Sequence, residues 1–185
     1  MQDKDIKPAY KHSKVGNFMF FICAKITKIL VEIRPLYYLL ACIWGFLMTF
    51  IGILITIALG IAKIFNKNIH FEKYYWIYNI KAGPEYWGGF EMGLMFVRDQ
   101  NSIKSLNAHE FGHTFQNCFF GPLMPFIVSI PSAVRYWYQE LRRRKGKDNK
   151  PYDSIWFEDA ATQCGEYAIK YIETKQEVKE LLRKN

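Results

Sequence analysis

The feature of this sequence that most limits its fold is a run of 27 residues, from Leu36 to Ala62, without a single charged side chain. At 1.5 Å per residue, a helix of that length measures about 40 Å, which exceeds the roughly 30 Å hydrocarbon core of a bilayer. Arg34 and Lys63 bracket the run, and Trp44 lies near its start, as interfacial anchors do. A soluble helix of that length would show a polar face. The run therefore predicts one transmembrane span.

Residues 18–33, which precede this run, form a different kind of segment. They are apolar but interrupted by Lys25, Lys28 and Glu32, which favours an interfacial amphipathic helix. A cleavable signal peptide is not expected, because the hydrophobic block starts late and is too long. Residues 1–64 are therefore expected to form a basic, interfacial and transmembrane anchor that stays attached to a domain at 65–185.

The strongest chemical signal is H-E-x-x-H at residues 109–113. On a helix, residues four apart lie on one face about 5–6 Å apart at Cβ, so His109 and His113 can bind one metal ion. In zinc sites with this motif the glutamate, here Glu110, takes a proton from metal-bound water. The motif therefore predicts one Zn²⁺ ion and a general base. A helix whose histidines are satisfied by core hydrogen bonds, or a zinc site that only holds the fold together, remain open alternatives.

The four cysteines do not form a recognisable set of zinc ligands. A structural zinc site is usually closed by four protein ligands rich in cysteine, whereas a catalytic site keeps three and leaves a position for water. The four cysteines are scattered, with no C-x-x-C, although Cys118 or Cys164 stays possible as a sulfur ligand. Because the other two histidines precede the motif, a later carboxylate is the expected third ligand.

The best third ligand lies in residues 156–165. Glu158 shares a narrow helical face with small residues at positions i+3, i+4 and i+7, which would let this helix pack closely on the motif helix. Asp159 points about 100° away and is the second choice, or a hydrogen-bond partner for a histidine N–H. Glu166 is the third choice. Glu158 as a mere acidic residue in a first helical turn stays open.

Two motifs together resemble the gluzincin-type zinc metallopeptidases. They are residues 109–116, H-E-F-G-H-T-F-Q, and residues 158–165, E-x-x-A-T-x-x-G. The sequence looks most like small membrane-associated bacterial proteins that carry H-E-[FY]-G-H-T-x-Q, then a Gly-Pro-Leu run ending in Pro-Ser, here residues 121–132, and then E-x-x-A-D-x-x-G. The likeness covers roughly residues 88–166.

This resemblance implies His109 and His113 as ligands, Glu110 as base and Glu158 as third ligand. It departs at Thr162, where the similar proteins carry an aspartate, which often orients a ligand histidine. Thr162 is therefore a candidate for the hydrogen-bonding layer behind the ligands. The resemblance carries over no substrate.

Residues 88–99 are bounded by glycine and rich in apolar and aromatic residues, which predicts a strand or hairpin. Alternation would put Phe90, Met92, Leu94 and Phe96 on one face. In gluzincin-like enzymes an edge strand just before the active helix pairs with the extended substrate, so Phe90, Met92 and Leu94 become candidate substrate-strand residues. A strand that meets no ligand is the open alternative.

Two further features favour contact with lipid. The apolar stretch 118–134 contains three prolines, which suits an element embedded in a membrane interface better than a straight span. The net charge of +8 gathers in the N-terminal segment and in residues 142–147, and both suit anionic head groups. Nucleic acid is not expected, because no nucleic-acid-binding motif accompanies the basic runs. A solvated loop stays open for 142–150.

The class expected from these placements is α+β, mainly α. Interfacial and transmembrane N-terminal helices precede a small zincin-like domain whose short sheet, of two to four strands, packs on the H-E-x-x-H helix. That helix should cover 102–118, capped by Ser102 or Ser105, with further helices at 132–145 and 154–174 and a helical tail at 175–185. The basic run 142–147 favours a cytoplasmic site, and the unpaired cysteines agree with a reducing compartment.

The first functional hypothesis is a membrane-anchored zinc metallopeptidase that hydrolyses peptide bonds in a peptide or protein substrate. The residue that stabilises the oxyanion is not assigned, and Tyr152, Tyr167 and Tyr171 are candidates by nearness alone. A hydrolase of non-peptide amides is a variant of this hypothesis. The alternative from another class is a non-enzymatic membrane protein whose metal site stabilises a partner- or lipid-binding module.

Overall fold

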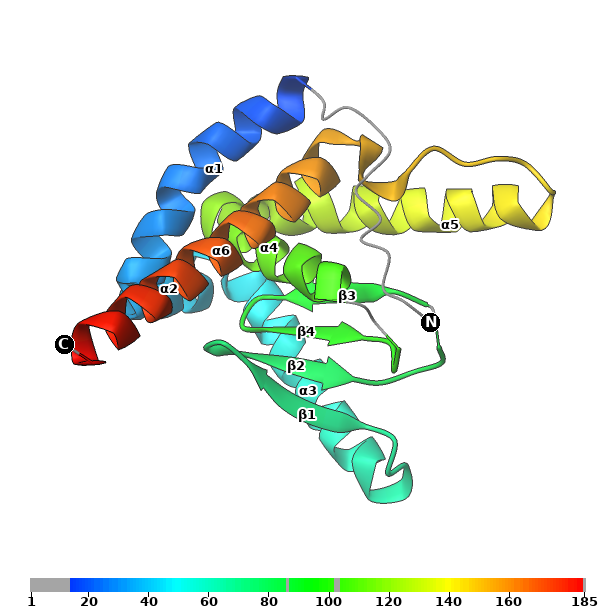
Figure 1. The fold of residues 1–185 in the computed structure, drawn as a ribbon. Helices are drawn as coiled ribbons and strands as arrows, with labels where there is room; N and C mark the ends of the chain where they lie inside the picture. The colour runs from blue at the N-terminus through cyan, green and yellow to red at the C-terminus, as the bar shows by residue number, and fades with distance from the viewer. Residues whose placement is uncertain (1–13, 86, 102–103, 185) are drawn as a thin grey trace.

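A computed structural model describes residues 14–85, 87–101 and 104–184 of the chain. It is mainly helical with one four-stranded sheet (Figure 1), as the sequence predicts. The α-helices are α1 (Lys14–Glu32), α2 (Arg34–Leu39), α3 (Phe46–Phe65), α4 (Lys104–Phe120), α5 (Ile130–Arg144) and α6 (Trp156–Lys184). Short π and 3₁₀ turns join several of them: η1 (Leu40–Trp44), η2 (Gly121–Leu123), η3 (Pro125–Ser129) and η4 (Tyr152–Ser154).

The sheet is mixed and has the order β1-β2-β4-β3. Its strands are β1 (His70–Tyr74), β2 (Ile77–Lys81), β3 (Gly89–Met92) and β4 (Met95–Arg98). Strands β2 and β4 are parallel, and the other two pairs are antiparallel. One face packs on α4 through Ile77 and Phe96, and the other packs on α3 through Ile80 and Val97. The sheet therefore lies between these two helices (Figure 1), with β3 at one edge.

The predicted hairpin at 88–99 is present, but the prediction that Phe90, Met92 and Phe96 share one face is wrong for Phe96. The chain turns at Gly93-Leu94, where Gly93 adopts a φ of +70° and its backbone meets Thr49 of α3. Cross-strand partners share a face, so Met92 lies with its partner Met95, and Phe96 lies on the opposite face. An unbroken alternation across residues 90–96 fails because the two-residue turn shifts the register.

The uncharged run from Leu36 onward is not one helix. Its first part forms α2 and η1, where Tyr37 and Ala41 are fully buried among aromatic residues of the core. After Gly45 the chain continues as α3, the one helix among the described residues that is long and apolar enough to cross a membrane. Tyr37 packs on Trp76 and Phe115, which holds the start of the run against the rest of the protein.

The remaining helices largely follow the predictions. Helix α4 ends where Gly121 takes a φ of +56°, next to Pro122, and α5 covers the expected segment. The two helices expected at 154–174 and 175–185 are one continuous helix, α6, which packs on α1 and α4. Residues of α1 and α2 share a hydrophobic cluster with α4 and α6.

Ser102 and the first N-terminal lysines lie outside the described residues. The division of the chain into an anchor and a domain at 64/65 stays a prediction.

Candidate metal centre

Helix α4 carries the H-E-x-x-H motif in its middle turns. Every residue from Ala108 to Cys118 is buried except His109. Its apolar side chains Phe111 and Phe115 enter the aromatic core, which fixes the rotation of the helix. The two histidines then emerge one turn apart on the other face, and their Nε2 atoms lie 3.1 Å from each other. The prediction that both imidazoles point to one place is confirmed.

Helix α6 approaches this face of α4 at backbone contact. A Cβ added to Gly112 would lie 1.8 Å from the Ala161 carbonyl oxygen, and one added to Gly165 would lie 1.7 Å from that of Ala108. Neither position can accept any side chain without a shift of the helices. The small residues predicted to allow close packing therefore set the distance between α4 and α6, which brings Glu158 to the histidines.

Three side-chain atoms meet at this crossing. The Oε2 atom of Glu158 lies 3.0 Å from Nε2 of His109 and 3.1 Å from Nε2 of His113. The Glu158 side chain is fully buried, while the His109 side chain is 12% exposed. Together these residues form a buried group that can hold a metal ion. The second carboxylate oxygen of Glu158 is buried without a hydrogen-bond partner.

Each histidine is held in orientation through its other nitrogen. Nδ1 of His109 lies 2.8 Å from the hydroxyl of Thr162, and Nδ1 of His113 lies 2.8 Å from Oε1 of Gln116. Gln116 in turn donates to the Phe157 carbonyl at 2.8 Å, and Thr162 donates to the Glu158 carbonyl at 3.2 Å. Because the Nδ1 atoms are engaged, both Nε2 atoms are directed to the same point, as in many metal sites.

Thr162 therefore holds the position at which the resemblance had expected an aspartate. Gln116 belongs to the first motif, but the sequence predicted no role for it. The signal that could have found it is its spacing: three residues after His113 on a helix, a side chain reaches back to its neighbour. Its full burial, which only the fold reveals, makes an unpaired amide costly and explains the two bonds.

The group attracts positive charge. Burial by itself raises the pKa of Glu158, but the charge of His113 and hydrogen bonds from both imidazoles hold that pKa well below its ordinary value. Burial by itself lowers the pKa of His113, but the Glu158 carboxylate outweighs burial and the pKa rises to about 9. Three acceptor atoms about 3 Å apart repel one another unless a proton or a cation lies between them. The arrangement thus favours a cation where they meet.

Glu110 lies beside this point and is almost fully buried. Its carboxylate faces the start of β3, where a Cβ on Gly89 would lie 3.0 Å from Oε1, and its Oε2 has no hydrogen-bond partner. Burial raises the pKa of this carboxyl, and the two histidines oppose the rise. An unpaired oxygen on a buried carboxylate next to a candidate metal site is available to a small polar molecule.

A second buried carboxyl, which the sequence analysis did not assign, comes from β3. Glu91 accepts the backbone N–H of Gly93 through Oε1, while Oε2 is buried without a partner. Burial raises the pKa of this carboxyl to about 8, opposed by the charge of His113. Glu91 lies on the face of β3 that packs on α4, and this packing buries its side chain.

The three tyrosines considered for oxyanion binding lie in different places. The Tyr152 ring is 6.4 Å from the His109 ring, and the Glu158 and Glu110 charges add to the effect of burial that raises the Tyr152 pKa. The Tyr152 hydroxyl bonds to Ser132 at 2.5 Å. In contrast, Tyr167 and Tyr171 stack on each other and contact α1 through Phe20 and Glu32. Only Tyr152 is near the candidate centre.

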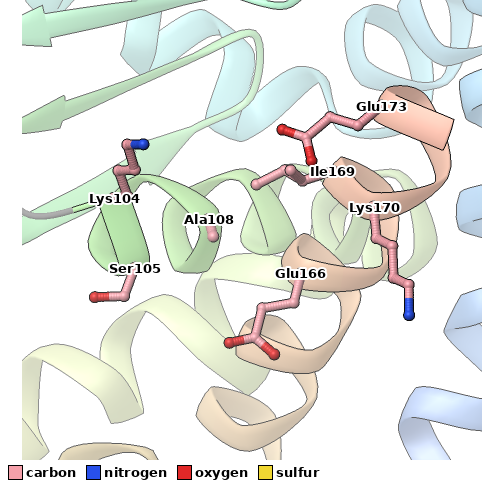
Figure 2. Close-up of a pocket in the computed structure, with 7 residues that line it drawn as sticks. All are labelled: Lys104, Ser105, Ala108, Glu166, Ile169, Lys170 and Glu173. Atoms are coloured by element: carbon pink, nitrogen blue, oxygen red, sulfur yellow. The ribbon is translucent and has the colours of Figure 1, made fainter. Parts of the chain in front are cut away.

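Other predicted ligands do not join the group. Asp159 is buried and accepts from Gln163, and Cys118 contacts the Tyr37 carbonyl. Glu166 lines a separate shallow pocket of about 260 Å³ between the start of α4 and α6 (Figure 2). Figure 2 shows the lining residues, which are Lys104, Ser105 and Ala108 of α4 and Glu166, Ile169, Lys170 and Glu173 of α6, and none of the three candidate ligands is among them. Among the described residues, neither Asp159, Glu166 nor a cysteine is grouped with His109.

The substrate-strand candidates lie on or next to the edge strand. Phe90 and Met92 belong to β3, and Leu94 lies in the turn that follows. Phe90 and Met92 pack with the cluster between the sheet and α3, on the face away from Glu110. Asp99 donates its N–H to the Gly88 carbonyl at 2.9 Å, so Gly88 is a hydrogen-bonded position of the β3–β4 pair. Because hydrogen-bonded and non-hydrogen-bonded positions alternate in an antiparallel pair, the backbone N–H and C=O groups of Gly89 and Glu91 point away from β4, toward the unpaired edge of β3.

Comparison of the chain with protein-family models, with curated proteins and with solved structures finds no match in any of the three.

Proposed function

We propose that this chain is a membrane-bound zinc metallopeptidase. The observation that carries the proposal is the convergence of Nε2 of His109, Nε2 of His113 and Oε2 of Glu158 within 3.1 Å of one another, beside the buried carboxylate of Glu110. Two histidines and a carboxylate are the ligand set of one class of catalytic zinc site. A general base next to that set is what hydrolysis requires.

The donor atoms fit zinc. Bonds from zinc to imidazole nitrogen and carboxylate oxygen measure about 2.0–2.2 Å. The three atoms are 3.0–3.1 Å apart, less than twice that length, so one point can lie at bonding distance from all of them. The engaged Nδ1 atoms favour Nε2 as the ligating nitrogen of each histidine. A bound zinc ion would supply a Lewis acid that polarises a carbonyl and makes water more acidic.

The roles of the side chains follow from their positions. Glu110 would accept the proton of the attacking water through its unpaired Oε2 and later deliver it to the leaving amine. Thr162 and Gln116 would hold the two imidazoles fixed during this exchange. The backbone of Gly89 and Glu91, at the sheet edge beside Glu110, would pair with an extended peptide. Tyr152 is the candidate donor to the developing oxyanion.

The non-enzymatic alternative predicted a fourth protein ligand, such as Cys118 or Cys164. Within residues 14–85, 87–101 and 104–184 the group has three members, and Cys118 contacts the Tyr37 carbonyl instead. A three-ligand group leaves a position for water, which supports the enzyme. The membrane part of the proposal is supported by α3, of which only 17% is buried.

The test uses the purified full chain with zinc content and peptide hydrolysis measured on the same samples. Glu110→Gln keeps the shape of the side chain but cannot act as a base, so it should retain one zinc ion per chain and lose activity by at least about 100-fold. Glu158→Ala should lose zinc, while Asp159→Ala should keep it. Normal cleavage by Glu110→Gln would remove the proposed base, and equal zinc content in all three variants would remove Glu158 as a ligand.

A further inference from the structure

Helix α3 is packed against the sheet along most of its length. Near its start, a Cβ on Gly52 would lie 2.5 Å from the Met92 carbonyl oxygen. Further along, Ile55 and Leu59 pack on the cluster that contains Ile80 and Val97. At its end, the Lys63 ammonium lies 5.2 Å from the centre of the Phe71 ring of β1. The sheet therefore occupies the inner face of α3 from Gly52 to Lys63.

This packing conflicts with a simple crossing of the bilayer. Gly52 and Lys63 are about 16 Å apart along the helix at 1.5 Å per residue, roughly half of a hydrocarbon core of about 30 Å. If α3 stood across the membrane, the sheet would be carried into that core with it. The sheet has two open edges, β1 and β3, and β1 carries Glu72 and Lys73. Open sheet edges are not found facing lipid, because their backbone groups would lack hydrogen bonds.

The outer face of α3 nevertheless needs an apolar cover. Large apolar side chains recur on it every three or four residues, and each is about half exposed or more. They are Phe46, Phe50, Ile53, Leu54, Ile57, Ile61 and Ile64. A helix that is apolar all round is normally buried on all sides. Here the sheet covers one side, and nothing among the described residues covers the other.

Helix α5 continues the same kind of surface. It has no buried residue and projects from the body of the molecule (Figure 1). Large apolar residues of η3 and α5 form one stripe with helical spacing, each more than half exposed: Phe126, Ile130, Val134, Trp137 and Leu141. The helix ends in Arg142, Arg143 and Arg144. An apolar stripe with an aromatic residue and a cationic end is the pattern of a helix lying in an anionic membrane interface.

The two exposed surfaces begin side by side. The Trp44 indole N–H, just before α3, donates to the Phe119 carbonyl at the end of α4, at 3.3 Å. On the inner side Met48 of α3 packs with Met124 and Val128, which lead into α5. We propose that α3 and α5 lie in one leaflet of a membrane containing anionic lipid, with their outer faces in the boundary between head groups and acyl chains, so that the protein is attached to one side and does not cross.

This proposal concerns how the chain meets the membrane and does not depend on hydrolysis. Lipid is favoured over a second copy of the chain because the stripe of α5 ends in clustered cations, which would repel the same cluster on a twofold-related copy. The single span predicted from the sequence and the one-sided attachment differ in one measurable quantity, the depth of the α3 side chains in the bilayer.

The experiment is a depth measurement with single nitroxide spin labels. The full chain is reconstituted in vesicles of phosphatidylcholine and phosphatidylglycerol, with Cys42→Ser removing the exposed native thiol. Labels replace Phe50, Ile57 or Ile64 in turn on the outer face of α3. Val134→Cys reports on α5, and Val178→Cys on α6 is the matched control, an equally apolar residue that is 50% exposed elsewhere. Relative collision with oxygen and with a water-soluble nickel chelate gives depth.

Attachment to one side predicts similar shallow depths for all three α3 labels and for Val134, about 5–10 Å into the interface, with Val178 in water. A crossing helix would instead put Ile57 near the centre of the core, about 15 Å deep, with Phe50 and Ile64 shallower. That profile would overturn the proposal. Magnetic coupling between labels on different chains, without access to lipid, would show a second copy on this face and would also overturn it.

A second measurement avoids substitutions on the apolar face. Lys25→Cys and Lys67→Cys lie before and after α3 and are exposed. In sealed vesicles, a membrane-impermeant maleimide should label both or neither within each orientation of the protein, since both ends of α3 are on one side. Labelling of opposite members of the pair before and after the vesicles are opened would contradict the proposal. The Cys42→Ser protein without an added cysteine measures background labelling.

Discussion

Side chains are covered at the crossing of α4 and α6, but they are exposed on the outer faces of α3 and α5. At the crossing, small residues bring two backbones into contact, and buried polar atoms are paired through Thr162 and Gln116. Along α3 and α5, large apolar residues are exposed, and no residue of the described part of the chain covers them. At the crossing, the described residues themselves cover nearly all of the side chains, whereas the outer faces of α3 and α5 need an apolar environment supplied by other molecules.

The two regions leave different kinds of position open for other molecules. Around the two histidines, three buried carboxylates each have an oxygen without a hydrogen-bond partner: Glu110, Glu158 and, on the neighbouring strand, Glu91. These suit a cation or a small polar molecule. On α3 and α5 the uncovered surface is broad and apolar, which suits lipid. The following predictions test whether α4 and α6 are in close contact, and whether the buried polar side chains beside them depend on burial and hydrogen bonding as this contrast requires.

The largest effect is expected at Gly165. In Gly165→Ala the new methyl group would overlap the Ala108 carbonyl, so α6 must move away from α4. We expect the free energy of unfolding in detergent micelles to fall by about 3 kcal/mol, the upper range for overpacking. Gly60→Ala in α3, where nothing lies within 4 Å of the added Cβ, is the matched control and should gain about 0.5–1 kcal/mol. Equal stability of the two variants would refute a tight crossing.

The next effect is a dependence of stability on pH through Glu91. Its pKa is about 8 in the folded protein against an ordinary value of 4.5, because burial disfavours the charged form. The folded state therefore holds a proton that the unfolded state releases, and stability should fall as pH rises from about 4.5 to about 8. The expected loss is on the order of a few kcal/mol.

Glu91→Gln should make this slope shallower, while the raised pKa values of His113 and Glu110 leave part of it in place. The measurement is chemical unfolding of chelator-treated protein across that pH range, with wild type and variant side by side. Glu140→Gln, on exposed α5, is the control and should leave the slope unchanged. A wild type whose stability is flat between pH 5 and 8 would contradict the buried, protonated state of Glu91.

A smaller effect is expected when the hydroxyl behind His109 is removed. Thr162→Val keeps the shape of the side chain but cannot bond to Nδ1, so zinc affinity should fall about 10–100-fold. Thr162→Ser should restore it. Thr56→Val on α3, whose hydroxyl bonds within its own helix to Gly52, should leave affinity unchanged. Competition with a chromogenic chelator measures all four proteins, and an unaltered affinity in Thr162→Val would mean that His109 needs no such support.

Much of the fold and part of the candidate site could be predicted because the relevant patterns are local. The spacing of His109 and His113 already places both imidazoles on one face of a helix. Glycines and prolines correctly predicted the hairpin at 88–99 and the end of α4. The small residues around Gly165 predicted close packing with the correct partner helix. Each of these inferences depends on neighbours within a few residues, where backbone geometry is nearly fixed.

Other features depend on residues that are far apart in the chain. The sequence could not show that Tyr37 packs on Trp76 and Phe115, nor that Glu91 is buried beneath α4. It also could not choose Tyr152 over Tyr167 and Tyr171, which differ only in which helix they meet.

The spacing of residue types alone places two histidines and a glutamate on one helix and marks a long apolar segment in need of cover. The tertiary structure decided which carboxylate joins the histidines, because only the Gly112–Gly165 contact sets the distance between the two helices. It also decided that one side of α3 is covered by the sheet. Periodicity determines which residues share a face, but what each face meets is a property of the folded chain.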